Sequence, residues 1–199
     1  MSANLLLIFA RHPELGKVKT RLAKSIGDEK ALKIYKFLLK RTLSITQNLP
    51  MDKEVWYVEG VQENDKWDRK FFDKKTQKGE DLGERMQNAF SEGFQNGYEK
   101  IVIVGTDIYD LTENDILSAF EKLQENDVVI GPAADGGYYL LGMKTLRPEI
   151  FQDKNWGSGT VLKETLADLN PKTLFLLETR HDVDVYEDIV GIDTFKIFL

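Results

Sequence analysis

Apolar residues along the chain fall into short unbroken runs that alternate with amphipathic stretches. Residues 4–10 (NLLLIFA) and 100–105 (KIVIVG) show no polar alternation, which is typical of strands covered on both faces. Residues 28–47 and 81–96 instead carry apolar side chains at steps of three and four, which predicts amphipathic helices. Because strands and helices alternate, we expect a parallel α/β sheet.

The same alternation continues through the rest of the chain. Further strands are predicted at residues 54–58, 127–130, 138–143 and 173–177, and further helices at 112–123 and 158–169. Side chains that can accept hydrogen bonds from a first helical turn mark the helix starts: Asp28, Asp81 with Glu84, Thr112 with Asp115, and Ser158. Too few residues separate strands 127–130 and 138–143 for a helical crossover. The later strand should therefore run antiparallel to its neighbour or take another position in a mixed sheet.

The composition is that of a globular protein with one domain. The chain has 199 residues, of which 42% are hydrophobic and 30% charged, and it has no cysteine. A chain of this length buries about 70% of its unfolded surface, so residues 1–199 are expected to form a single domain. The lack of cysteine excludes a disulfide scaffold, a thiolate metal site and a cysteine nucleophile. The early apolar run is too short for a membrane span and lacks signal-peptide features, so we expect a cytoplasmic protein without a membrane anchor.

Charge is distributed unevenly along the sequence. The 27 cationic and 33 anionic side chains give a net charge of −6, which disfavours nucleic acid and anionic lipid as partners. Five cations nevertheless fall within residues 11–24, against the single acid Glu14: Arg11, Lys17, Lys19, Arg21 and Lys24. A cationic segment in an acidic protein predicts a small anionic ligand.

This cationic segment follows the first predicted strand, where parallel sheets bind ligands. Pro13 and Gly16 shape the turn, and Lys17, Lys19 and Arg21 offer donors for phosphate oxygens. A solvated basic surface explains the same run equally well. The loop lacks the glycines of a dinucleotide-binding fingerprint or a P-loop, so any phosphate would be held mainly by side chains.

Two aspartates follow the strand at 100–105. Asp107 is placed to coordinate Mg²⁺ or Mn²⁺, which take oxygen ligands and bridge to substrate phosphates. It could equally cap the following turn. Asp110 either supports Asp107 or caps the turn, and the nearby helix start at Thr112 favours the cap.

A glycine-rich segment, GPAADGGYY, occupies residues 131–139. Gly136 and Gly137 would let the backbone approach a ligand closely, and Asp135 and Tyr138 could contact a sugar or an acceptor hydroxyl. A tight turn into the next strand would explain the two glycines just as well.

An acidic stretch, HDVDVYED, occupies residues 181–188. If it is extended, Asp182 and Asp184 point the same way, so either could complete a metal site begun by Asp107. A helix capped by Asp184, with Glu187 three residues later, is the competing interpretation and the one that the local pattern favours. His181 is expected to be exposed or structural.

Five motifs share one order over nearly the whole chain: FARHPELGKVKTRL (9–22), QKGEDLGERM (77–86), GTDIYDL (105–111), GPAADGGYYLLG (131–142) and DVDVYEDI (182–189). On these motifs the chain resembles the transferase family named for its association with radical-SAM and selenoprotein-type domains. That family belongs to the nucleotide-diphospho-sugar transferase (GT-A-like) superfamily.

The resemblance implies a three-layer α/β/α fold with a mixed, mostly parallel sheet. It also implies that an activated nucleotide binds across the first half of this fold and that the second half forms the acceptor side. It implies that Asp107 holds Mg²⁺ or Mn²⁺ on the phosphates, with Asp184 or Asp182 as a second ligand. The residues that it implies for nucleotide and phosphate binding are Arg11, Gly16, Lys17, Lys19, Arg21, Gly79 and Arg85.

The chain departs from the family pattern at three places. Arg11 replaces a lysine, which keeps the charge but changes its geometry. Tyr109 replaces a proline, and the pair at 185–186 (VY) replaces Thr-Pro, so the loops around the implied metal lose two rigid turns. Each carboxylate is retained.

The leading hypothesis is a metal-dependent transferase that acts on a nucleotide-activated small molecule. Asp107 would place the metal on the diphosphate, and Lys17 with Arg21 would stabilise the leaving phosphate. As a glycosyltransferase, the protein would release a nucleoside diphosphate from a nucleotide sugar. Asp135, with Gly136, Gly137 and Tyr138 beside it, would bind or deprotonate the acceptor.

Two other hypotheses stay open. A nucleotidyltransferase would join a nucleoside triphosphate to a phosphorylated acceptor and release pyrophosphate, and the five-cation segment suits a triphosphate well. A non-catalytic accessory protein would keep the nucleotide site without turnover. The products formed distinguish all three hypotheses, and the sequence does not indicate the oligomeric state.

Overall fold

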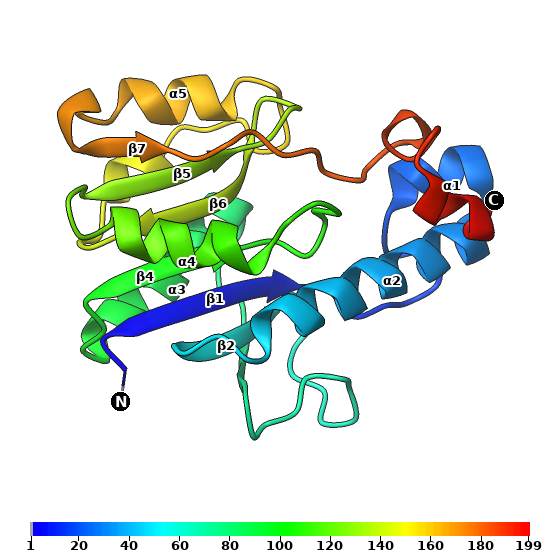
Figure 1. Cartoon of the computed structure of the whole chain (residues 1–199), viewed down its shortest axis with the longest axis horizontal. Coiled ribbons are helices and arrows are strands. Elements are labelled where there is room, and N and C mark those ends of the chain that lie inside the picture. The colour runs from blue at the N-terminus through cyan, green and yellow to red at the C-terminus, as the bar shows by residue number, and fades with distance from the viewer. Residues whose placement is uncertain (1) are drawn as a thin grey trace.

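A seven-stranded sheet runs through the molecule, with helices on both of its faces (Figure 1). A computed structural model describes residues 2–199. The strand order is β3-β2-β1-β4-β6-β5-β7, and only β6 runs antiparallel to its neighbours in the described sheet. The predicted α/β fold with a mixed, mostly parallel sheet is therefore confirmed, including the reversed strand at residues 138–143.

The central strands coincide with the apolar runs of the sequence. The strands are β1 (Asn4–Ala10), β2 (Asp52–Tyr57), β3 (Asp73–Thr76), β4 (Lys100–Val104), β5 (Val128–Pro132), β6 (Tyr138–Met143) and β7 (Leu174–Leu176). The edge strand β3 was not predicted, because its sequence DKKT has no apolar side chain. Its Lys74 is nevertheless buried, and the ammonium Nζ lies 2.7 Å from Oδ1 of Asp65.

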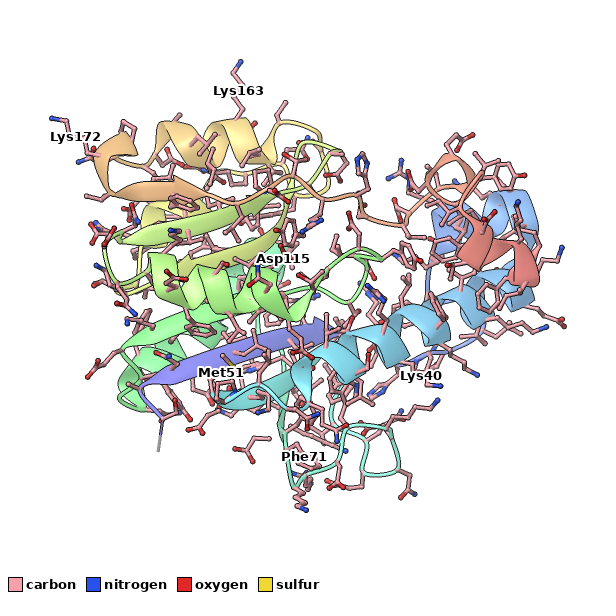
Figure 2. The ribbon with its side chains drawn as sticks, viewed as in Figure 1. Lys40, Met51, Phe71, Asp115, Lys163 and Lys172 are labelled. Atoms are coloured by element: carbon pink, nitrogen blue, oxygen red, sulfur yellow. The ribbon has the colours of Figure 1, made fainter. Side chains whose placement is uncertain are left out.

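Two helices cover each face of the sheet. The helices are α1 (Thr20–Ile26), α2 (Asp28–Thr46), α3 (Leu82–Gln95), α4 (Glu113–Lys122) and α5 (Val161–Ala167), with short 3₁₀ helices η1 (Pro148–Phe151), η2 (Pro171–Thr173), η3 (Tyr186–Asp188) and η4 (Asp193–Phe198). Helices α2 and α4 pack on one face, and α3 and α5 on the other. In Figure 2, Lys163 of α5 and Lys172 of η2 point away from the sheet. No helix between residues 2 and 199 has the length and apolar character to span a bilayer.

Two of the predicted helix caps are confirmed. The Asp81 carboxylate accepts a hydrogen bond from the backbone N–H of Glu84 at 2.9 Å, which starts α3. Thr112 and Asp115 bond reciprocally at the start of α4, as a capping box does.

The other two predicted caps are wrong. Gly27, with φ of 85°, is the only residue between α1 and α2, so Asp28 lies inside the first turn of α2 and caps nothing. Helix α5 starts at Val161, two residues later than a cap at Ser158 would place it. The Ser158 hydroxyl instead lies 2.8 Å from that of Thr160.

A small third core, separate from the cores on the two faces of the sheet, forms beyond the carboxyl ends of the strands. It joins α1, α2, η3 and η4, and its buried residues include Leu22, Phe195 and Val183. Figure 1 shows α1 and the C-terminus together beyond the tip of β1. Because Val183 belongs to this core, its neighbours Asp182 and Asp184 are brought to the loop after β1.

Candidate active site

A cleft of about 660 Å³ opens at the carboxyl ends of β1 and β4, beside the start of β6. The predicted site residues that line it are Arg11, Lys17, Lys19, Arg21, Arg85, Asp107, Asp135, Gly137, Tyr138, Asp182 and Asp184. The predicted residues outside its lining are Gly16, Gly79 and Gly136. Five segments that are distant in the sequence therefore converge on one cavity.

The loop after β1 is held at its start by Tyr35 of α2. The backbone N–H of Arg11 donates to the Tyr35 hydroxyl at 2.9 Å, and that hydroxyl donates to the Arg11 carbonyl at 3.1 Å. Burial, followed by the negative charge of Asp107, raises the pKa of Tyr35 to about 12. The hydroxyl thus stays neutral and able to donate, which fixes the position of the loop.

Lys19 has an unusual backbone conformation where this loop turns into α1. Its φ of 49° and ψ of 43° lie in the left-handed region, which residues other than glycine rarely adopt. Its side chain is only 5% exposed, and Nζ lies 2.9 Å from Oδ2 of Asp107. Strained backbone of this kind persists where its surroundings fix it, often at functional sites. The turn therefore delivers a buried ammonium to the carboxylate that we expected to bind a metal.

The other three cations of the loop that line the cleft also have acidic partners. The pairs, with their N···O distances, are Arg11 with Glu59 at 3.6 Å, Lys17 with Glu14 at 2.6 Å, and Arg21 with Asp184 at 2.6 Å. The side chain of Lys17 is mostly exposed, and its partner belongs to the same loop. Lys19 and Arg21, rather than Lys17, thus contact the aspartates selected as metal ligands.

The chain after β7 carries two acidic residues to the cleft. The backbone N–H of Val183 donates to the carbonyl of Asp107 at 3.0 Å, and Asp182 pairs with Ile108 as an antiparallel bridge. Asp182 and Asp184 flank Val183, and both line the cleft beside Asp107. The three aspartates selected from the sequence are therefore neighbours in space.

Arg180, which we did not select from the sequence, anchors this segment. Its backbone exchanges hydrogen bonds of 3.0 and 2.9 Å with the end of β5 and the loop that follows. Its guanidinium lies 2.8 Å from Asp115 and 3.7 Å from Asp110. The favoured interpretation of Asp110 as a cap is thus wrong, because Thr112 caps α4 and Asp110 pairs with Arg180.

Asp188, rather than Asp184, accepts the hydrogen bonds at the start of η3. Its Oδ2 accepts from the backbone N–H groups of Asp184 and Val185, each at 2.7 Å. The chain is still extended at Val185, so Asp184 lies too early to cap this helix. The interpretation of Asp184 as a cap with Glu187 is therefore wrong, and its carboxylate lies in the cleft instead.

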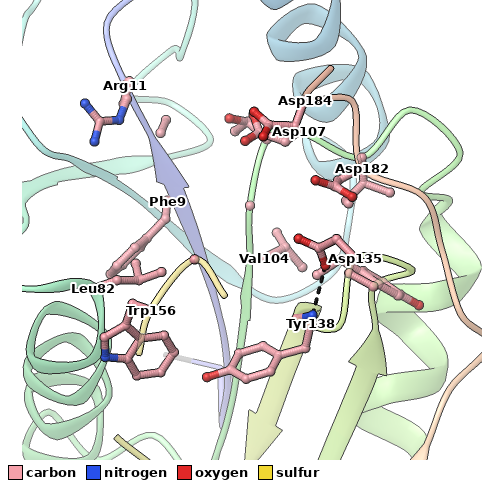
Figure 3. A pocket seen from close by; sticks show the side chains of 18 of the residues that line it. Phe9, Arg11, Leu82, Val104, Asp107, Asp135, Tyr138, Trp156, Asp182 and Asp184 are labelled. Atoms are coloured by element: carbon pink, nitrogen blue, oxygen red, sulfur yellow. Dashed lines mark hydrogen bonds between the residues drawn. The ribbon is translucent and has the colours of Figure 1, made fainter. Parts of the chain in front are cut away.

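Asp135 and Asp182 place two carboxylates on the same side of the cleft (Figure 3). Burial, and then the negative charge of Asp135, raise the pKa of Asp182 to about 6. The Oδ1 atom of Asp135 accepts a hydrogen bond from the backbone N–H of Gly137 at 2.9 Å, which fixes the turn before β6. Neighbouring carboxylates of this kind favour a bound proton or cation.

The acidic residues of the cleft fit a hard divalent cation in their chemistry. Mg²⁺ and Mn²⁺ prefer carboxylate oxygens, and Asp107, Asp182 and Asp184 supply them. Across residues 2–199, no three acidic or histidine side chains are close enough together to hold a metal ion. Lys19 and Arg21 instead provide the positive charge beside two of the carboxylates. A metal ion bound there would replace Lys19 as the partner of Asp107.

Gly79 supports the cleft indirectly. Its φ is 141°, and a Cβ atom added to it would lie 2.8 Å from the backbone nitrogen of Arg85. The Gly79 carbonyl accepts a hydrogen bond from Nε of Arg85 at 2.9 Å. The glycine thus orients Arg85, whose side chain lines the cleft.

Gly136 is required by the neighbouring backbone. Its φ is 90°, and an added Cβ would lie 2.1 Å from the carbonyl oxygen of Gly159. We expect Gly136→Ala to lower the free energy of unfolding by about 3 kcal/mol, since it combines left-handed strain with a backbone clash. Chemical denaturation measures this change. The matched control is Gly97→Ala, because Gly97 also has φ of 90° but open space around it, and a loss of about 1 kcal/mol is expected there. Equal losses would contradict the clash.

Apolar side chains that we did not select line the end of the cleft away from the aspartates. They are Phe9, Leu82 and Trp156, which Figure 3 labels, together with Met86, which lies one turn after Leu82 on α3. Three of them belong to β1 and α3, where apolar residues are expected in any case for packing. The sequence therefore held no signal that would separate them from core residues.

Comparisons with known proteins agree with this fold. The sequence profile of the family described as "Uncharacterized protein conserved in bacteria (DUF2064)" matches residues 42–158. No curated protein matches the sequence significantly. A crystal structure of a provisionally named nucleotide-diphospho-sugar transferase from Desulfovibrio desulfuricans G20 is 31% identical, with a TM-score of 0.86 over 98% of this chain and 91% of that chain.

Two other solved structures share the fold at low identity. One is 4-diphosphocytidyl-2C-methyl-D-erythritol synthase from Anaerococcus prevotii DSM 20548, at 10% identity and a TM-score of 0.57, covering 96% of this chain and 95% of that chain. The other is Rv0371c from Mycobacterium tuberculosis H37Rv in complex with manganese, at 13% identity and a TM-score of 0.51, covering 93% and 94%. The fold is thus that of the nucleotide-diphospho-sugar transferases.

Proposed function

We propose that this chain, which belongs to the DUF2064 family of bacterial proteins, is a metal-dependent transferase that takes a nucleotide sugar as its donor. The observation that carries the proposal is the contact between Lys19 and Asp107 inside one cleft. A cation suited to phosphate and a carboxylate suited to a metal face each other there. A pyrophosphate group with a bound divalent ion needs both of these partners.

Lys19 and Arg21 would hold the phosphate oxygens of the donor. Both cations now contact carboxylates, and a diphosphate offers them a more highly charged partner. Lys17 lies on the same loop and lines the cleft from a more exposed position. These groups would stabilise the charge that develops on the departing nucleoside diphosphate.

Asp107, with Asp184 or Asp182, would hold Mg²⁺ or Mn²⁺. Such an ion supplies positive charge to the leaving diphosphate. The manganese complex of Rv0371c, which shares the fold, supports the choice of a divalent ion. In the free protein Lys19 supplies the positive charge beside Asp107.

Asp135 would act as the base on the acceptor. One of its oxygens is bonded to the backbone of Gly137, so the carboxylate is held at a fixed place in the cleft. It would take the proton of an acceptor hydroxyl while that oxygen bonds to the sugar carbon and the bond from this carbon to the diphosphate breaks. A base at this position favours glycosyl transfer, because an acceptor phosphate is already ionised.

Nucleotidyl transfer is the second candidate, favoured by the number of cations around the cleft. The five that line it are Arg11, Lys17, Lys19, Arg21 and Arg85. A nucleoside triphosphate carries more charge than a nucleotide sugar and would engage more of them. The structure of 4-diphosphocytidyl-2C-methyl-D-erythritol synthase shows that this fold also serves a synthase whose product carries a cytidine diphosphate.

A thermal-shift screen of nucleoside triphosphates and nucleotide sugars, each with Mg²⁺, Mn²⁺ or chelator, tests the proposal. We expect stabilisation that needs both metal and nucleotide, of several degrees when the ligand is at about 100 times its dissociation constant. Release of a nucleoside diphosphate from a nucleotide sugar would support glycosyl transfer, and pyrophosphate from a triphosphate would support nucleotidyl transfer. Stabilisation without any product would favour an accessory binding protein. No shift with any nucleotide would contradict the proposal.

The remaining expectations stay predictions. They are a cytoplasmic location, a single domain over residues 1–199, small-molecule partners rather than nucleic acid, and the association with radical-SAM and selenoprotein-type domains. The negative net charge supports the choice of partners, because it disfavours nucleic acid.

A further inference from the structure

One end of the cleft is aromatic and apolar. Phe9 of β1, Leu82 and Met86 of α3, Tyr138 of β6, and Trp156 line this end, which is called the aromatic compartment below. In Figure 3 the ring of Tyr138 reaches toward Trp156, below Phe9 and Leu82, and the labelled aspartates lie further up. The cleft therefore has a charged end and an aromatic end.

The Tyr138 hydroxyl is buried and has no hydrogen-bond partner among the described residues. Burial raises the pKa of this hydroxyl well above its ordinary value, so it is a neutral donor. Nearly all buried polar groups in folded proteins are bonded, and an exception at the wall of a cleft calls for an explanation such as a ligand. Phenylalanine would fill the same space without this unsatisfied group.

The walls of the aromatic compartment are apolar and fixed. The centroids of the Tyr138 and Trp156 rings are 6.4 Å apart, and the ring planes are nearly perpendicular, at 88°. The indole lies directly against Gly83 of α3, where an added Cβ would be 2.5 Å from it. Leu82 is 43% exposed, although it lines the cleft. A bound apolar group would gain contact with this leucine.

We propose that the aromatic compartment binds a flat aromatic or heteroaromatic ring of a substrate, with an acceptor atom of the ring receiving a hydrogen bond from Tyr138. The inference rests on the proposed function and deepens it. A hexose has hydroxyl groups all around its ring, and several would be unpaired against Phe9, Leu82 and Met86. A flat ring instead packs well against aromatic faces and edges, and one acceptor atom of it would satisfy the unpaired Tyr138 hydroxyl.

Two sources would supply such a ring, namely the base of the nucleotide or a ring of the acceptor. Both share the chemistry that the compartment selects, which is a flat apolar face and one hydrogen-bond acceptor. Because the phosphate-binding cations lie at the charged end of the cleft, each source can be tested with its ring attached to phosphate. The probes are ATP, GTP, CTP and UTP for the base, 4-nitrophenyl phosphate for an acceptor ring, and inorganic tripolyphosphate as the anion without a ring.

Tyr138→Phe tests the inference when the affinity of each probe is measured by calorimetry in Mn²⁺. We expect about a tenfold loss for a ring-bearing probe, since one hydrogen bond to a buried donor is lost, and no change for tripolyphosphate. We also expect the melting temperature to rise by about 2 °C, because the unsatisfied hydroxyl is removed. A gain in stability with a loss of affinity would not arise from a purely structural role.

Tyr98→Phe is the matched control. Its hydroxyl donates to Asp52 at 3.0 Å outside the cleft, so this variant should lose stability and keep every affinity. Leu82→Ser, at the exposed rim of the compartment, is a second variant and should weaken the same ring-bearing probe.

The outcomes separate the inference from the proposed function. A loss confined to nucleotides assigns the compartment to the base, and a loss confined to 4-nitrophenyl phosphate assigns it to an acceptor ring. If ring-bearing probes bind the wild-type protein and both variants equally, or if tripolyphosphate binds and no ring-bearing probe does, the inference is overturned. A wild-type protein that binds neither tripolyphosphate nor any nucleotide would contradict the proposed function itself.

Discussion

Replacing Asp107 with asparagine is expected to lower the affinity for a nucleoside triphosphate in Mn²⁺ on the order of 100-fold. The neutral amide is a poor ligand for a hard cation, and the metal contribution to phosphate binding is lost. In the presence of a chelator, no loss of nucleotide affinity is expected. There the variant should bind the nucleotide at least as tightly as the wild type, because Lys19 no longer has Asp107 as a competing partner. Calorimetric titration under both conditions measures the two affinities.

Asp193→Asn is the matched control for this substitution. The carboxylate of Asp193 is 90% exposed on η4 and does not line the cleft, so its loss should change neither affinity. The fold should survive Asp107→Asn, since the Asp107 side chain is 48% exposed and its backbone carbonyl still accepts from Val183. An unchanged affinity for the nucleotide in Mn²⁺ would remove Asp107 from the metal site.

Elements that bury an apolar pattern could be predicted from the sequence, and elements that depend on distant partners could not. Strands β1 and β4 and helices α3 and α4 lie where the apolar patterns place them, because each buries a face of the expected kind. Strand β3 is polar and is ordered through Lys74 and Asp65, which meet only in the folded chain. Helix α1 is seven residues long and follows a left-handed residue, so it has no local starting signal.

The location of the cleft follows from a general rule, but the roles of its residues depend on local geometry. Carboxyl ends of parallel strands meet at one edge of a sheet, which selects the loops after β1 and β4. Sequence spacing alone could not show which of Lys17 and Lys19 contacts Asp107, because both lie on one basic loop. The left-handed turn at Lys19 makes the difference, because it buries the Lys19 side chain against Asp107, whereas Lys17 pairs with Glu14 of its own loop. Nor could the sequence assign Arg180, because two of its acidic partners, Asp110 and Asp115, lie 70 and 65 residues earlier in the chain.

The metal and the nucleotide are expected to respond in opposite ways to Lys19→Met. Methionine keeps much of the side-chain length without the charge, so affinity for a nucleoside triphosphate should fall on the order of 100-fold, in Mn²⁺ and in chelator alike. Affinity for Mn²⁺ alone should rise several-fold, because an ammonium now 2.9 Å from the Asp107 carboxylate would no longer repel the ion. Calorimetry measures the first change, and the electron paramagnetic resonance signal of free Mn²⁺ measures the second.

The two affinities are expected to change in opposite directions because the Lys19 ammonium has two partners. It pairs with the Asp107 carboxylate in the free protein, where it would repel a metal ion, and with the phosphate in the complex. Lys24→Met is the matched control, because Lys24 is an exposed lysine of helix α1, which follows Lys19 directly, and it does not line the cleft. Both affinities should be unchanged in that variant. If Lys19→Met weakened the nucleotide and Mn²⁺ together, Lys19 would help to build the metal site instead of competing for it. If it changed neither, the contact of Lys19 with Asp107 would be purely structural, and the phosphate would have to be held by Arg21 and the exposed Lys17.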